Sequence, residues 1–132
     1  MRVISWNMNK RKNDNWNWLI DNFDPDFVLA QESSKLPDDI EAAEKTTTNK
    51  NNRSAFFAKS RDFDLIKTSS DHGMGVLVTK SEDIFFICVY ANLSFKPVVN
   101  LPLLGVIMKY LSGIRRRHNA KNILIAGDFN MD

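Results

Sequence analysis

Three segments of the chain place carboxylate or carboxamide side chains directly after a short apolar run. The polar residues, each with the preceding run, are Asn7 and Asn9 (2–6), Glu32 (27–30), and Asp128 and Asn130 (122–126). Oxygen ligands of this kind suit Mg²⁺ or Mn²⁺, which take one or two carboxylates and leave positions for water and phosphate oxygens. Carboxamides can orient a phosphate or a nucleophile without repelling either. The pattern therefore predicts metal-assisted chemistry at a phosphate group.

The apolar runs read as strands, because they are too short for helices and are bounded by polar or turn residues. We expect strands at 2–6, 27–30, 54–59, 64–68, 74–79, 84–91 and 122–126, and the turn at 80–83 predicts a hairpin. Helices are expected at 14–23 and 102–117, with a short third one at 37–45. The Thr- and Asn-rich segment that follows, up to Asn52, is expected to be an exposed, mobile loop.

The two main helices each carry an apolar stripe at helical spacing. The stripe residues are Trp16, Leu19, Ile20 and Phe23 in the first helix, and Leu104, Ile107, Met108 and Leu111 in the second. Trp16 and Trp18 are therefore interpreted as part of a core pattern and not as base-stacking platforms. These elements predict an α/β protein with a mixed, mainly antiparallel sheet and its helices on one face.

Three motifs in this order resemble those of the endonuclease/exonuclease/phosphatase superfamily. They are Ile4-Ser5-Trp6-Asn7-Met8-Asn9, Val28-Leu29-Ala30-Gln31-Glu32-Ser33 and Ile125-Ala126-Gly127-Asp128-Phe129-Asn130. The resemblance implies a four-layer sandwich of the α+β type, of which residues 1–132 would form the first half, as a single truncated domain. The motifs are specific for the superfamily and not for one substrate.

The resemblance also implies roles for individual residues. Glu32 would hold Mg²⁺ or Mn²⁺ with help from Asn9, and Asp128 would orient or deprotonate the attacking water. Phosphate contacts would come from Asn7 and Asn130, with Tyr90, Asn92 and Lys10 near the substrate. Structural alternatives stay open: Glu32 as a solvated strand end, Asp128 as a helix cap, and Tyr90 as a packed strand-end side chain.

Two further segments attract a functional interpretation that the sequence does not favour. Ser70-Asp71-His72 matches the family's C-terminal Ser-Asp-His motif, but it precedes Asp128 instead of following it, and we interpret it as a coincidence within a loop. The run Arg115–His118 is basic, yet cations in the last turn of a helix are favoured by the helix dipole. Lys10, with its basic neighbours, lies at the rim that a substrate would approach.

Composition is consistent with one folded domain and narrows the function little. The 132 residues have a net charge of +2, which is too small by itself to indicate nucleic-acid binding. Cys88 is the single cysteine and lies within an apolar run, so a buried, inert thiol is expected. No segment is long and apolar enough to span a membrane, and the sequence lacks a signal-peptide pattern, so an intracellular, cytoplasmic protein is the default.

The sequence thus predicts a metal-dependent phosphoesterase of the nuclease or phosphatase type, with DNA, RNA, inositol phosphate and lipid open as substrates. The family's C-terminal histidine motif is missing after Asp128, so weak or no activity is expected of this chain alone. The alternatives are a non-catalytic binding remnant and a domain completed by a partner or by self-association. Self-association is expected because the run 84–89 is apolar on both faces, one of which the helices would leave uncovered.

Overall fold

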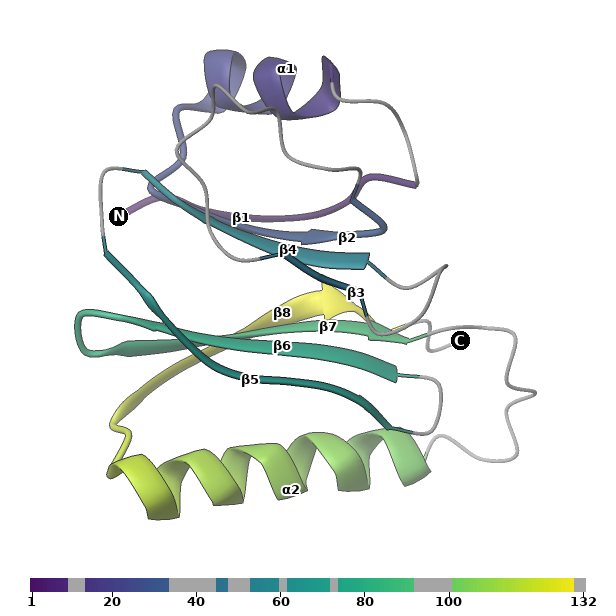
Figure 1. Ribbon diagram of the computed structural model, residues 1–132, viewed down its shortest axis with the longest axis vertical. Coiled ribbons are helices and arrows are strands. Elements are labelled where there is room, and N and C mark those ends of the chain that lie inside the picture. The colour runs from purple at the N-terminus through teal and green to yellow at the C-terminus, as the bar shows by residue number, and fades with distance from the viewer. Residues whose placement is uncertain are drawn as a thin grey trace.

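The computed structural model describes residues 1–9, 14–33, 45–47, 53–59, 62–71, 74–91 and 101–129, which form four layers (Figure 1). Two β-sheets pack face to face in the middle, and one helix covers the outer face of each. The elements are β1 (Val3–Asn7), α1 (Asp14–Phe23), β2 (Phe27–Gln31), β3 (Lys45–Thr47), β4 (Arg53–Ala58), β5 (Asp64–Asp71), β6 (Met74–Ser81), β7 (Ile84–Ala91), α2 (Leu101–His118) and β8 (Asn122–Asp128).

Each sheet contains one pair of parallel strands joined through a helix. The first sheet has the order β1-β2-β4-β3, with β1 parallel to β2 and α1 between them in sequence. The second has the order β5-β6-β7-β8, with β7 parallel to β8 and α2 as the connection. Parallel strands require such a crossover, which lies on a face of the sheet. The C-terminal ends of β7 and β8 both point to the right in Figure 1.

Apolar side chains fill the three interfaces between the four layers. The sheets meet through a cluster that includes Phe27, Phe56 and Phe86, each at most 2% exposed. Trp16 and Leu19 of α1 pack on the outer face of the first sheet, and Tyr110 and Ile114 of α2 pack on that of the second. The core therefore consists of three apolar clusters, one at each interface, which hold both parallel pairs in place.

The predicted α/β sandwich class is confirmed, but the placement of the helices differs from the expectation. α1 and α2 lie on opposite sides of the sandwich and do not share one face (Figure 1). Consequently both faces of β7 are covered within the chain: Phe86 and Cys88 face the first sheet, while Phe85 and Ile87 face α2. The uncovered apolar face, which was the reason to expect self-association, is not present.

Several local expectations also change. Thr46 and Thr47, expected in a mobile loop, belong to the short strand β3, which pairs with β4. Residues 37–44 of the expected third helix lie outside the described part of the chain. In α2, the predicted stripe is confirmed at Ile107 and Leu111, which pack against the core, but Leu104 and Met108 are exposed. The buried positions of the helix are Tyr110 and Ile114, because the helix is rotated relative to the expected stripe. The predicted hairpin between β6 and β7 is confirmed.

Candidate active site

The C-terminal ends of β1, β2, β7 and β8 meet at one end of the sandwich. There they place two carboxylates next to one side-chain amide. The Asn7 Nδ2 group donates to Asp128 Oδ2 at 2.5 Å and reaches Glu32 Oε1 at 3.5 Å. All three side chains are half-buried. Asn7 and Glu32 come from the first sheet and Asp128 from the second, so the site lies across the interface between the sheets.

Tyr90 adds a second donor to the same carboxylate. Its hydroxyl donates to Glu32 Oε1 at 2.8 Å from the end of β7. Burial raises the pKa of Tyr90 well above its usual range, and the hydrogen bond to Glu32 and the negative charges of Glu32 and Asp128 act in the same direction. Tyr90 is therefore a neutral hydrogen-bond donor at physiological pH, and it fixes the orientation of Glu32.

The backbone turns sharply at two residues of the site. Asn9 and Glu32 have φ angles of 49° and 48°, in the left-handed region. Asparagine tolerates this region, whereas it is uncommon for glutamate and costs about 1–3 kcal/mol. The backbone N–H of Asn9 also donates to Asn7 Oδ1 at 2.9 Å, which leaves Nδ2 of Asn7 directed at the carboxylates. Strain of this kind concentrates at functional sites.

Gly127 sets the position of Asp128. Its φ is 155°, and a Cβ atom on this residue would lie 2.0 Å from the Val89 carbonyl oxygen on β7. Only glycine allows the two backbones to approach this closely. β8 can therefore stay paired with β7 up to the register position Tyr90–Asp128, where the carboxylate enters the site.

A buried polar contact supports the site from behind. Gln31 is 1% exposed, and its Nε2 group donates to the Leu29 carbonyl at 2.8 Å and contacts Cys88 Sγ at 3.2 Å and Ser5 Oγ at 3.3 Å. These contacts link β1 and β2 to β7. Cys88 is buried, as expected, and burial raises the pKa of its thiol from 9.0 to about 11.

The donor set fits a divalent cation of the Mg²⁺ type. Glu32 and Asp128 supply carboxylate oxygens within reach of one amide, and such cations are commonly bound by one or two carboxylates with water filling the other positions. Within the described ranges no group of three or more His, Cys, Asp or Glu residues comes together. A site of this composition would bind weakly, because few protein ligands compensate for dehydration of the cation.

The structure brings together four of the predicted site residues, Asn7, Glu32, Tyr90 and Asp128, and places Asn9 beside them. The other three, Lys10, Asn92 and Asn130, lie outside the described residues, as does His72. Ser70 and Asp71 do not lie in a loop as expected. They form the last two positions of β5, paired with Gly75 and Met74, because the β5–β6 ladder continues to the end of the strand.

Sequence reasoning overlooked the structural role of Gln31 and the exposure of Trp18. Gln31 shares a strand face with Leu29, and that alternation was a readable signal that its amide points into the interior. Trp18 is 52% exposed and packs with Trp6, with ring centroids 5.7 Å apart. No helix within the described ranges is long and apolar enough to cross a membrane.

Comparison of the sequence with protein families and curated proteins finds no match. Solved structures do match. TDP2 from Caenorhabditis elegans aligns with a TM-score of 0.67 at 15% identity, over 98% of this chain and 48% of that protein. D. rerio TDP2, solved with a single-strand DNA product, aligns with a TM-score of 0.62 at 13% identity, over 100% of this chain and 61% of the other.

A third similar structure is the endonuclease domain of TRAS1, a telomere-specific non-LTR retrotransposon. It aligns with a TM-score of 0.61 at 12% identity, over 99% of this chain and 59% of the other. The chain thus spans about half of the length of the C. elegans structure and three fifths of the other two. The chain shares the fold of these three structures, which agrees with the fold that the resemblance of the three motifs implied.

Proposed function

We propose that the end of the sandwich formed by Asn7, Glu32, Tyr90 and Asp128 is a divalent-cation-dependent site for hydrolysis of a phosphate ester. One observation carries the proposal: two carboxylates from different sheets converge on the Nδ2 group of Asn7, at 2.5 and 3.5 Å. Like charges brought this close repel each other, and a bound cation would relieve that repulsion. A purely structural strand end has no reason to gather them.

The side chains divide into binding and proton-transfer roles. Glu32 would hold Mg²⁺ or Mn²⁺, with Asn9 beside it, and the Tyr90 hydroxyl at 2.8 Å would keep the Glu32 carboxylate in one orientation. When bound, the cation polarises a phosphate oxygen and neutralises developing negative charge. Asp128, held by Asn7, would orient an attacking water and accept its proton, a contribution of typically 10²- to 10⁴-fold to rate.

The substrate that we propose is a phosphodiester of DNA. Support comes from the similar structures, one of which was solved with a single-strand DNA product and another of which is an endonuclease domain. Three residues outside the described part of the chain would add a cation and two amides to the substrate contact. They are Lys10, Asn92 and Asn130. We propose phosphate contacts for them, alongside Asn7.

The test compares two glutamates that share a backbone conformation. Glu32 has a φ of 48°, and Glu82, in the turn between β6 and β7 at the opposite end of the second sheet, has a φ of 53°. Calorimetric titration with Mn²⁺ should show at least tenfold weaker binding for Glu32→Gln than for the wild type. Glu82→Gln should bind as the wild type does, which separates a site effect from a general change in charge.

Activity is measured on a labelled single-stranded oligonucleotide with Mn²⁺ and with EDTA. Metal-dependent cleavage that is lost in Asp128→Asn, with Mn²⁺ binding weakened less than in Glu32→Gln, supports the assigned roles. If Mn²⁺ binds but no cleavage occurs, the site is a binding module and the proposed hydrolysis is wrong. Equal Mn²⁺ affinity in Glu32→Gln and in the wild type would remove Glu32 from the site altogether.

A further inference from the structure

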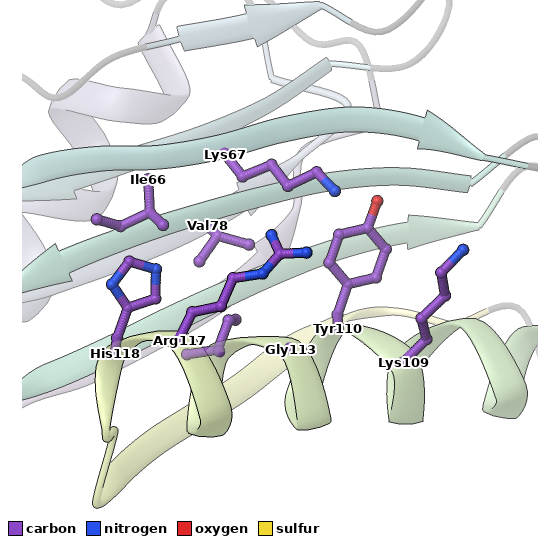
Figure 2. A pocket seen from close by; sticks show the side chains of 9 residues that line it. Ile66, Lys67, Val78, Lys109, Tyr110, Gly113, Arg117 and His118 are labelled. Atoms are coloured by element: carbon purple, nitrogen blue, oxygen red, sulfur yellow. The ribbon is translucent and has the colours of Figure 1, made fainter.

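A hollow lies between α2 and the outer face of the second sheet, away from the candidate active site. It has a volume of about 170 Å³, and its walls include Lys67 on β5, Val78 on β6, and Lys109, Tyr110, Arg117 and His118 on α2 (Figure 2). Ile66 and Ile114 add to its apolar floor. We refer to this hollow as the α2 cleft.

The α2 cleft carries positive charge on both walls. Lys67 comes from the sheet and Lys109 and Arg117 come from the helix, and none of the residues that line the cleft is acidic. Figure 2 shows the Lys67 and Arg117 side chains directed toward the same space beside the Tyr110 ring. The Lys67 Nζ atom lies 4.7 Å from the centre of that ring, a cation–π distance. The cations converge without a protein anion in the lining to neutralise them.

Gly113 lines the α2 cleft without adding a side chain to it. It lies inside α2 on the side that lines the cleft, and a Cβ atom added to it would meet nothing within 4 Å. Glycine in a helix interior is unfavourable relative to alanine, and here no close packing contact requires it. The same helix has a second glycine, Gly105, which also has open space around it but does not line the cleft.

We propose that the α2 cleft binds the phosphate group of a small phosphorylated molecule. Arginine and lysine donors arranged on two facing walls suit a compact, multiply charged phosphate, and Tyr110 with the apolar floor suits the uncharged part of the same molecule. A nucleic-acid strand would instead call for a basic stripe along the surface. The volume is below that of sites for drug-sized ligands, so the cleft admits the phosphate end and leaves the rest at its mouth.

The α2 cleft is separate from the candidate active site. Val78 pairs with Ile87, three residues before Tyr90 on the same strand, which is ~10 Å along β7 at the rise of an extended strand. The cleft also opens on the α2 side of the second sheet, whereas Tyr90 and Asp128 meet Glu32 across the inter-sheet interface. A ligand in the cleft therefore touches none of the residues of the candidate active site.

The matched substitutions are Arg117→Ala against Arg116→Ala, and Gly113→Leu against Gly105→Leu. In each pair the first residue lines the α2 cleft, and the second is on the same helix outside it. Calorimetric titration of the metal-free protein in EDTA with pyrophosphate and with ATP should give binding that Arg117→Ala and Gly113→Leu weaken at least tenfold. Arg116→Ala and Gly105→Leu should bind within twofold of the wild type.

Three outcomes overturn the proposal. If neither pyrophosphate nor ATP binds to the wild type at millimolar concentration, or if the two members of each pair weaken binding equally, the cleft is not a specific site. A 12-nucleotide single strand is titrated in parallel. Tighter binding of that strand, weakened alike by Arg116→Ala and Arg117→Ala, would identify a nucleic-acid surface in place of a small-molecule site. Melting curves of all four variants establish that each one is folded.

Discussion

Replacing Gly127 by alanine should separate β8 from β7 and destabilise the whole sandwich. The new Cβ atom would lie 2.0 Å from the Val89 carbonyl oxygen and 2.8 Å from two other backbone atoms of Val89, and contacts below 3.0 Å essentially never occur. The strands must therefore part by about 1 Å at this position, which lengthens a hydrogen bond of ~2.9 Å beyond the bonding range.

The cost follows from the number of contacts that this shift disturbs. Losing two ladder hydrogen bonds costs about 1 kcal/mol each, and placing a non-glycine residue at the positive φ of this position costs about 1–3 kcal/mol. The free energy of unfolding should therefore fall by roughly 3–5 kcal/mol. Because domains are stable by only about 5–15 kcal/mol, Gly127→Ala should lower the melting temperature by roughly 10–20 °C.

Urea unfolding followed by circular dichroism measures the effect. The control is Gly105→Ala, because Gly105 is exposed within α2 and has open space around it. That variant should gain about 0.5–1 kcal/mol from improved helix propensity. A Gly127→Ala protein whose free energy of unfolding lies within about 1 kcal/mol of the wild type would refute the reasoning, since β8 would then have accommodated the side chain without losing its pairing.

Two other predictions concern the core. The buried Cys88 thiol has a pKa raised from 9.0 to about 11, so its contribution to stability is complete below pH 9 and is lost as the pH rises to 11. Between pH 8 and pH 11, the free energy of unfolding measured by urea titration should therefore fall by about 2–3 kcal/mol more in the wild type than in Cys88→Ser. Equal dependence of the two free energies on pH would contradict this. Phe86→Ala, at a fully buried position between Phe27 and Phe56, should cost about 3–5 kcal/mol, against less than about 1.5 kcal/mol for Phe23→Ala, whose ring is 44% exposed. Similar losses in the two variants would show that the inter-sheet core is not the main source of stability.

Much of the secondary structure and the centre of the site could be predicted from local sequence. The continuous apolar run 84–91 and the turn before it predicted a hairpin strand whose bounds the structure reproduces. Glu32 and Asp128 stood out because each follows an apolar run and therefore lies at a strand end. The proximity of Asn7 to Glu32 also follows from a local rule, since β1 and β2 are parallel and present their C-terminal ends at the same edge. The approach of Asp128 depends instead on how the two sheets pack.

The division of the strands between two sheets could not be predicted in the same way. Phe85 and Phe86 indicate that both faces of β7 are buried, but the sequence does not say whether a helix, a sheet or another molecule covers each face. The α2 cleft could not be predicted from the sequence for a related reason. Arg117 fits the ordinary pattern of a helix C-terminus, and its position opposite Lys67 depends on how α2 rotates against a strand 50 residues earlier.

The hydrogen bond from Asn7 to Asp128 joins residues 121 positions apart. The hairpins of β5, β6 and β7 involve near neighbours in the chain and can form early, whereas contacts between distant residues come at a higher entropic cost and form late. During synthesis Asn7 and Glu32 leave the ribosome long before Asp128 does. The candidate active site is therefore assembled only when β8 joins β7, so a partly folded or incompletely synthesised chain cannot bring Asp128 to Asn7.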